Sequence, residues 1–225
     1  MKQKNEFFFD LDEKGSGEEN MGRDLYLLKE AEKGQFSCRI YSWEGAWVSL
    51  GRFQDPEKDL LPDAPAPFVK RPTGGKGVLH GHDITLSIAA PLHQLLMPNE
   101  DHQKYSRSVR KVYLVLIERI IQAFRRCQIQ AVLGENREAR SIIVSNSDCF
   151  AAISPSDVIE EFSGQKICGC ALRLTKKGVL LQASIPIAPP LVDPYSVFKA
   201  PATYHAQRLD LGNFANAIRQ EFMNF

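Results

Sequence analysis

The sequence has 225 residues, of which 44% are hydrophobic, and its 28 basic and 27 acidic residues give a formal net charge of +1. That much apolar material can build one substantial core, while the near balance of charge gives no electrostatic argument for binding nucleic acid or an anionic membrane surface. The longest apolar stretch, residues 112–124, is broken by Glu118 and Arg119, and the first residues lack the long apolar run of a secretory signal. We therefore expect a cytoplasmic protein with no membrane segment and no nucleic-acid partner.

The cysteines are few and scattered: they are Cys38, Cys127, Cys149, Cys168 and Cys170. An odd, dispersed set of this kind predicts reduced thiols rather than a disulfide framework. The Cys168–Cys170 spacing is too tight for the usual zinc fingers and no pair of histidines accompanies it, so we predict no metal site. Cys149 differs from the other four, which lie in apolar runs, because it stands in a polar, turn-prone loop.

The first part of the chain is expected to form short strands around one helix. A strand is predicted at residues 6–11. Asn20 is then expected to cap a helix that ends at Gly34. Further strands are predicted at residues 38–43, 47–50, 68–71, 77–80 and 83–89. In the last of these, apolar and polar residues alternate, which is typical of a half-buried strand.

The second part begins with the longest predicted helix, residues 106–127, whose apolar residues keep to one face. Strands are then predicted at residues 131–133, 141–145, 158–162, 166–175 and 179–186, and a helix closes the chain. The proline-rich segments 62–67 and 186–201 are expected to be surface loops. Runs of strands broken by a few helices predict an α+β fold with a mixed, mostly antiparallel sheet and flanking helices, in a single domain over residues 1–225.

The segment KRPTGGKGVLH, residues 70–80, combines glycine with positive charge. On local physics the favoured interpretation is a hairpin turn, in which Gly74 and Gly75 supply positive φ. The alternative is a backbone that a ligand can approach, because amides without β-carbons reach a phosphate or an acyl carbonyl, and Arg71 and Lys76 add charge. The spacing matches neither a Walker motif nor a dinucleotide fingerprint.

Two later segments contain candidate reactive groups. In SGQKICGCALR, residues 163–173, Lys166 is either an ordinary surface lysine or a donor at the lip of a groove, where Gly169 and Ala171 leave room for a ligand. In NSDCFAAISPSD, residues 146–157, Cys149 would be reactive only in an electropositive, partly exposed setting. Lys166 could supply that setting from across the hairpin, but this segment alone does not decide between a reactive and a structural thiol.

Taken in order, these segments resemble the catalytic domains of lipoate-protein ligases and octanoyltransferases, a family that also includes biotin-protein ligases. The resemblance extends over about residues 19–187, which leaves a tail and helix at 188–225. It is carried by ENMGRDLYLL, WVSLGRFQ, KRPTGGKGVLHGHDITLS, SGQKICGCALR and LLQASI. The segment DCFAAISPSD is most similar to the cysteine-type octanoyltransferases, and the implied fold is that of the biotin/lipoate ligases.

This resemblance implies an enzyme of protein lipoylation. Cys149 would carry an octanoyl or lipoyl group as a thioester, and Lys166 would stabilise the thiolate and polarise the carbonyl. The implied acyl slot is lined by Arg71, Thr73, Gly74, Gly75, Lys76, Gly77, His80, Gly169 and Ala171. A hydrogen-bonded structural role for His80 remains an equal alternative.

The implied acceptor is a lysine on the lipoyl domain of a 2-oxoacid dehydrogenase or on a glycine-cleavage H-type protein. An acyl carrier protein is a candidate donor. Octanoate or lipoate would enter as substrate, with no tightly bound cofactor.

Other functions stay open at this point. An ATP-dependent lipoate-protein ligase would form lipoyl-adenylate with ATP and Mg, and Cys149 would then be incidental. Biotin ligation is a more distant possibility. The chain departs from the family pattern at Lys76, Cys170, Leu172 and Ala183, and Leu172 is expected to remove a hydrogen bond to the ligand. These departures keep open a non-catalytic relative that binds acyl groups or carrier proteins.

Overall fold

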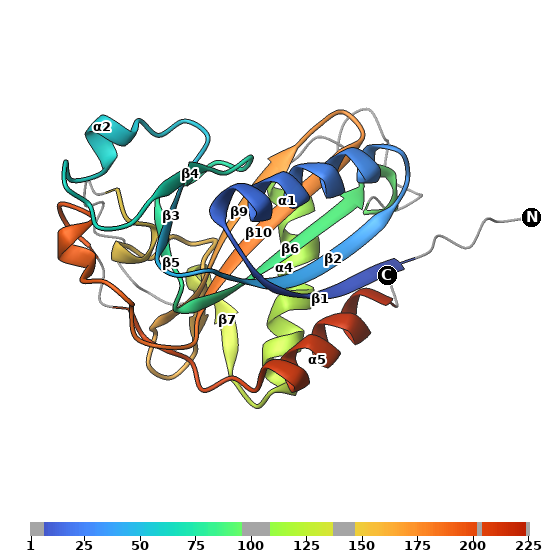
Figure 1. Cartoon of the computed structure of the whole chain (residues 1–225). Coiled ribbons are helices and arrows are strands. Elements are labelled where there is room, and N and C mark those ends of the chain that lie inside the picture. Colours follow the sequence, from blue (N-terminus) through green and yellow to red (C-terminus); the bar gives the residue numbers. More distant parts are fainter. Residues whose placement is uncertain (1–6, 96–108, 137–146, 202–203, 224–225) are drawn as a thin grey trace, which may run out of the picture.

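The computed structural model describes residues 7–95, 109–136, 147–201 and 204–223. Its main layer is a seven-stranded sheet in which β1 and β2 are parallel and the other neighbours are antiparallel (Figure 1). Across the sheet the order is β1 (Phe7–Gly15), β2 (Phe36–Trp43), β6 (Asp83–Pro91), β10 (Gly178–Pro186), β9 (Lys166–Leu174), β8 (Val158–Glu160) and β7 (Ala131–Leu133). The predicted α+β class with a mixed, mostly antiparallel sheet is confirmed.

Three helices cover the two faces of this sheet: α1 (Gly17–Glu32), α4 (Val109–Arg126) and α5 (Leu211–Met223). The short helix α2 (Pro56–Asp59) lies away from it, on the side of the small sheet (Figure 1). The apolar stripe of α4 packs with α5 on one face and forms the main core, whereas α1 packs on the other face against β6 and β10 (Figure 1). No helix in the described ranges is both long and apolar enough to cross a membrane.

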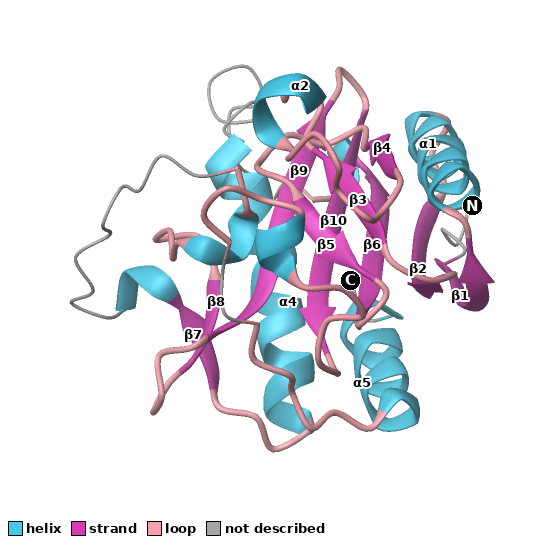
Figure 2. Cartoon of the chain, turned by 60° about the vertical axis from the view of Figure 1, so that its left-hand side comes forward, coloured by secondary structure: helices cyan, strands magenta, loops and turns pink. Residues whose placement is uncertain are grey.

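A small second sheet adjoins the large one. In it, β3 (Trp47–Leu50) lies between β4 (Phe68–Lys70) and β5 (Val78–His80), parallel to the first and antiparallel to the second. The glycine-rich turn, residues 71–77, connects β4 to β5, and β5 runs almost directly into β6 of the large sheet (Figure 2). The turn is therefore held where the two sheets meet.

The start of α1 differs from the sequence prediction. Ser16, not Asn20, caps the helix: its hydroxyl accepts from Glu19 N, and the Glu19 carboxylate accepts from Ser16 N at 2.9 Å, which is a complete capping box. Asn20 lies inside the helix and is 1% exposed. Its amide donates to backbone oxygens of Gly15 and Ser42, so it joins the helix to β2.

Strand β6 also differs, because all nine of its residues are buried rather than one face. Ile84, Leu86 and Ile88 pack into the main core as expected. The intervening Thr85 and Ser87 point to the other face of the sheet, on which α1 packs. A hydrogen bond from Trp43 Nε1 to Thr85 Oγ1, 2.9 Å long, satisfies one of these buried hydroxyls.

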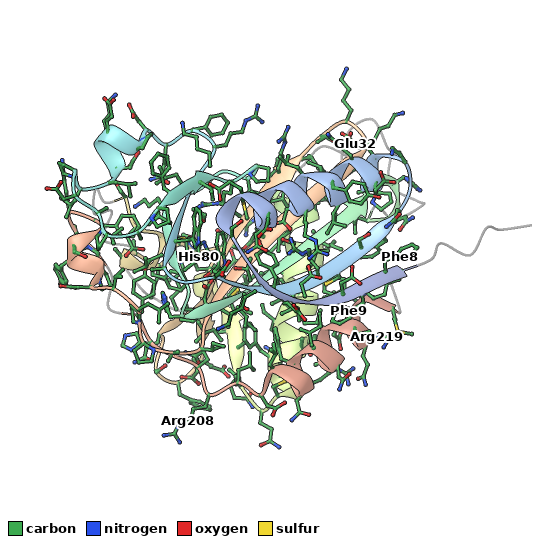
Figure 3. All side chains as sticks on the ribbon, viewed as in Figure 1. Phe8, Phe9, Glu32, His80, Arg208 and Arg219 are labelled. Carbon is green, nitrogen blue, oxygen red and sulfur yellow. The ribbon has the colours of Figure 1, made fainter. Side chains whose placement is uncertain are left out.

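The proline-rich segment after β10 is not simply a surface loop. Val197 and Phe198 are completely buried and form the core of the small sheet with Val48, Leu50 and Leu79. The predicted strand at residues 141–145 and the first residues of the predicted helix, 106–108, lie outside the described residues. Figure 3 shows the charged side chains of Arg208 and Arg219 at the surface and His80 well inside.

Candidate active site

Cys149 and Lys166 meet at one end of β9. Cys149 opens the short helix η3 (Cys149–Ala151), and Lys166 is the first residue of the strand. Lys166 Nζ lies 3.4 Å from Cys149 Sγ and donates to Cys149 O at 2.7 Å. The proximity fits the sequence prediction, but the expected position of Lys166 at the lip of a groove is wrong, because its side chain is 5% exposed.

A buried carboxylate supports the charge of this lysine. Asp157 Oδ2 lies 2.9 Å from Lys166 Nζ. Burial by itself lowers the pKa of Lys166, but the nearby charges of Cys149 and Asp157 outweigh it and raise that pKa above its ordinary value. Lys166 is therefore an ammonium at neutral pH, and it lies 3.4 Å from Cys149 Sγ.

The loop that carries Cys149 is fixed from two sides. Asp148 caps η3: its Oδ1 accepts from Phe150 N and from the Tyr204 hydroxyl, each at 2.9 Å. Cys149 N donates to Gly77 O at 2.8 Å, so the loop is paired directly to the end of the glycine-rich turn. These contacts position Cys149 relative to the glycine-rich turn.

Arg71 holds the glycine-rich turn in shape. Its Nη2 donates to the backbone oxygens of Gly74 and Lys76, both at 2.6 Å, and its Nε donates to Gly74 O. Its Nη1 donates to Ser49 O at 2.7 Å and to Ser49 Oγ. All five N–H groups of the guanidinium are thus engaged by the protein. Burial lowers the pKa of Arg71 to about 10, so it stays charged while it fastens the turn.

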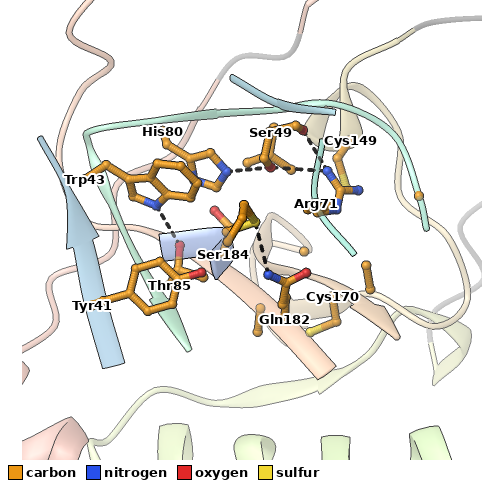
Figure 4. A pocket seen from close by; sticks show the side chains of 16 residues that line it. Tyr41, Trp43, Ser49, Arg71, His80, Thr85, Cys149, Cys170, Gln182 and Ser184 are labelled. Atoms are coloured by element: carbon orange, nitrogen blue, oxygen red, sulfur yellow. Dashed lines mark hydrogen bonds between the residues drawn. The ribbon is translucent and has the colours of Figure 1, made fainter. Parts of the chain in front are cut away.

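A cavity lies beneath this turn (Figure 4). Both sheets and α1 contribute to its wall, which consists of Met21, Tyr41, Trp43, Ser49, Arg71, Gly75, Val78, His80, Thr85, Cys149, Gly169, Cys170, Ala171, Gln182, Ala183 and Ser184. Among the predicted site residues, the ones that line it are Arg71, Gly75, His80, Cys149, Gly169 and Ala171. The ones that do not are Thr73, Gly74, Lys76, Gly77 and Lys166.

His80 is locked inside the wall of the cavity. Its two ring nitrogens lie 2.8 Å from Ser49 Oγ and 2.8 Å from Asp83 Oδ2, and its ring stacks on Trp43 with centroids 3.9 Å apart. The Ser184 hydroxyl donates to the same carboxylate at 2.6 Å. Both nitrogens of His80 are therefore engaged, as the structural interpretation of this histidine required.

Gln182 joins the glycine-rich turn to α1. Its amide nitrogen donates to Asp24 Oδ2 at 2.5 Å, and its amide oxygen accepts from Thr73 Oγ1 at 2.7 Å. Asp24 is completely buried and is paired with Arg39 at 2.9 Å. Thr73 thus lies behind the cavity wall, where it helps to hold the turn, and does not face the cavity itself.

Leu172 does not face the cavity. It packs against the main core and borders a separate surface hollow with Tyr113 and Leu133. The expected loss of a hydrogen bond to a ligand at Leu172 therefore has no basis in this geometry. Gly169 is the sensitive position on this strand, because a β-carbon there would lie 3.3 Å from Cys149 Sγ.

Sequence reasoning missed the residues that hold the reactive pair, His80 and the glycine-rich turn in place: Ser49, Asp83, Asp148, Asp157, Gln182 and Tyr204. Two of them carried a usable signal. Asp148 directly precedes Cys149 at a helix-cap position, and Asp157 ends the same polar loop. Ser49, Asp83, Gln182 and Tyr204 come from distant segments, which the fold brings together.

Residues 16–210 match the lipoyl protein ligase A/B catalytic domain, and the chain belongs to this family. Among curated relatives, octanoyltransferase LipM of Lysinibacillus sphaericus is 35% identical over 173 residues, which are 72% of this chain and 59% of the relative. Octanoyltransferase LipM of Bacillus subtilis is 34% identical over 173 residues, 72% of this chain and 58% of the relative. The chain thus spans less than two thirds of the length of either relative.

Solved structures share the fold at lower identity. Lipoate-protein ligase A bound with ATP has a TM-score of 0.70 and 18% identity, covering 99% of this chain and 85% of its own. The bi-partite lipoate protein ligase of Thermoplasma acidophilum, described with its E2 lipoyl domain, has a TM-score of 0.65 and 15% identity, covering 97% and 82%. These similarities show the fold, and with the matched family they confirm the family predicted from the motifs.

Proposed function

We propose that this chain transfers an octanoyl or lipoyl group to a lysine of a lipoyl domain through a thioester on Cys149. The observation that carries the proposal is the position of the Lys166 ammonium, 3.4 Å from Cys149 Sγ, beside a cavity that Cys149 lines. The cavity would hold the acyl chain, and Cys149 in its wall, with the adjacent Lys166, would hold the reacting carbonyl. On this proposal residues 1–225 act as one catalytic domain.

The proposed acyl transfer proceeds in two steps, formation of the enzyme thioester and transfer to the acceptor amine. The Cys149 thiolate attacks the acyl carbonyl of a carrier thioester, and the carrier leaves as a thiolate. The exchange replaces one thioester by another, so it needs no ATP. The acceptor amine then attacks the enzyme thioester, forms an amide with loss of a proton, and releases the Cys149 thiolate. Lys166 stabilises that thiolate before the first step and after the second.

The arrangement around the cavity favours the transferase over the ATP-dependent ligase. A ligase needs cations free to contact an adenylate phosphate. The Arg71 guanidinium is engaged by backbone oxygens and by Ser49, and the Lys166 ammonium is directed at Cys149 and Asp157. The curated relatives named octanoyltransferases point the same way. ATP and Mg would be required only under the ligase alternative.

The proposed partners follow from this chemistry. The acceptor would be the lipoyl domain of a 2-oxoacid dehydrogenase or a glycine-cleavage H-type protein, and an acyl carrier protein is the proposed donor. A lipoyl domain accompanies the ligase in one structural neighbour. All five cysteines are free thiols, which supports a reducing, cytoplasmic setting for the reaction.

The test compares two sources of the acyl group. The protein is mixed with a lipoyl domain and either octanoyl-acyl carrier protein without ATP, or free octanoate or lipoate with ATP and Mg. We expect an octanoyl amide on the acceptor lysine, detected by mass, from the thioester alone. Modification only from the free acid with ATP would establish the ligase instead. If neither source modifies the lipoyl domain, the remaining hypothesis is a non-catalytic protein that binds acyl groups or carrier proteins.

A further inference from the structure

Asp157 pairs with Lys166, and neither residue lines the cavity. The lysine has three N–H groups and three acceptors within reach: Asp157 Oδ2 at 2.9 Å, Cys149 O at 2.7 Å and Cys149 Sγ at 3.4 Å. The two oxygens make the close contacts, and they leave one N–H directed at the sulfur. The direction of that third N–H therefore depends on Asp157.

The carboxylate of Asp157 is itself fixed. Asp157 is 6% exposed. Its Oδ2 accepts from Ser154 N at 2.7 Å, its backbone N–H donates to Ser154 O at 3.0 Å, and its carbonyl accepts from Gly134 N at 2.8 Å. The loop before β8 therefore presents this oxygen at a defined point, as a positioning group must.

We propose that Asp157 is a positioning residue that holds the Lys166 ammonium against the Cys149 sulfur throughout the reaction. This inference rests on the proposed transfer through Cys149 and deepens it. When Cys149 carries an acyl group its sulfur has no charge, and Asp157 is then the counter-charge that remains in contact with the buried ammonium. The lysine would thus be in place to receive the thiolate when the amide forms.

Several titratable groups surround Lys166, and the charge of each can affect the pKa of the lysine. They are Cys149 on η3, Asp157 before β8, Cys168 on β9, Tyr113 of α4, which faces Asp157, and Arg71, which faces Cys149. Of these, Asp157 is the carboxylate in direct contact with the ammonium. Removing its charge lowers the pKa of Lys166, because burial then acts with less opposition.

The first test is Asp157→Asn, which keeps the shape and the acceptor oxygen but removes the charge. Octanoyl loading of Cys149 is followed by intact mass across pH, with Cys149→Ala as the blank for donor hydrolysis. The wild type should show no alkaline loss of loading below about pH 10. In Asp157→Asn the pH at which loading is lost on the alkaline side of the profile (the alkaline limb) should move down by about 1 pH unit or more. Loading at pH 7 should fall about tenfold. Glu161→Gln, an exposed carboxylate change nearby, should match the wild type.

A second readout separates this inference from the proposed function. Nitrogen-15 NMR of labelled lysine, with the Lys166 signal assigned from Lys166→Met, follows the Lys166 pKa without any substrate. If the wild type never accepts an acyl group, the proposed transfer fails, but a lower Lys166 pKa in Asp157→Asn would still support the coupling. An unmoved alkaline limb together with an unmoved Lys166 pKa would overturn it.

A second variant covers the case in which Asp157→Asn does not fold. Asp157→Glu keeps the charge but displaces the carboxylate by one methylene. We expect it to retain the wild-type alkaline limb and to load more slowly at every pH. Loading at the full wild-type rate would contradict a positioning role.

Discussion

Gly75 lies directly against Arg71: a β-carbon on Gly75 would stand 2.9 Å from Arg71 Nη2 and 3.7 Å from Ala171 Cβ. Gly75 also has a φ of +88°, which side-chain-bearing residues rarely adopt. Gly74 has an ordinary φ, and a β-carbon there would have nothing within 4 Å. The expectation that both glycines supply positive φ is therefore wrong for Gly74, and the pair offers a matched comparison.

Gly75→Ala should lower the free energy of unfolding by about 1 kcal/mol or more, because its φ is positive. Acyl loading should fall much further than the folded fraction, because the new methyl group disturbs both Arg71 and the cavity wall. Gly74→Ala should change neither quantity appreciably. The measurement is a thermal melt beside an acyl-loading assay on the same sample. Equal proportional losses in Gly75→Ala would reduce the turn to a hairpin connection.

Lys166→Met should both inactivate and destabilise the protein. The variant leaves Asp157 buried without its cation, which typically lowers the free energy of unfolding by about 3–5 kcal/mol. Acyl loading should fall at least about 100-fold, the scale of losing one electrostatic donor. A lysine at the lip of a groove, the position suggested by the sequence, could be replaced with little loss of stability, but the side chain of Lys166 is 5% exposed.

Urea denaturation measures the stability effect, with the exposed Lys177→Met as control. The double variant Lys166→Met/Asp157→Asn should recover part of the lost stability, because no unpaired charge then stays buried. Wild-type stability in the single Lys166→Met variant would show that the ion pair does not matter for folding.

His82 should make the protein less stable in mild acid. It is 2% exposed, and within the described part of the chain neither ring nitrogen has a hydrogen-bond partner. Burial lowers the pKa of His82 from the ordinary value of 6.5. The charge of Asp83 opposes this decrease in pKa, whereas His80 adds to it. The unfolded chain therefore binds the proton more readily, so stability is intact above about pH 6.5 and falls as the pH drops below it.

His82→Phe should flatten this dependence while it keeps an edge-to-face contact with Tyr204, whose ring centroid is 4.8 Å away. The measurement is the free energy of unfolding at several pH values between about 7 and 5, where an ordinary histidine titrates. The exposed His93→Gln should leave the slope unchanged. An identical slope in His82→Phe and the wild type would remove His82 as its source.

The fold was largely predictable because its helices and strands follow simple periodicity. The apolar stripe of α4 and the meander of β8, β9 and β10 are local patterns. Burial on the second face of β6 was not predictable, since Thr85 and Ser87 look like solvent-facing residues until α1 packs on that face. The cap at Ser16 was readable, because Glu19 stands three residues later as in any capping box.

The reactive pair was predictable, but its surroundings were not. Motifs in order along the chain indicated Cys149 and Lys166 before any contact was known. The ion pair to Asp157 and the links from Gln182 to Asp24 and Thr73 depend on which segments the sheet brings side by side. A hydrophobicity pattern carries no information about such polar pairings.

The most direct test of the account is the intact mass of the protein after incubation with an octanoyl thioester and no ATP. We predict the addition of one octanoyl group, removable by neutral hydroxylamine and located on the peptide that contains Cys149. Cys149→Ala should abolish it, whereas Cys170→Ser, which alters another thiol at the cavity, should retain it. Full acyl transfer by Cys149→Ala, or an adduct on a different cysteine, would contradict the proposed function.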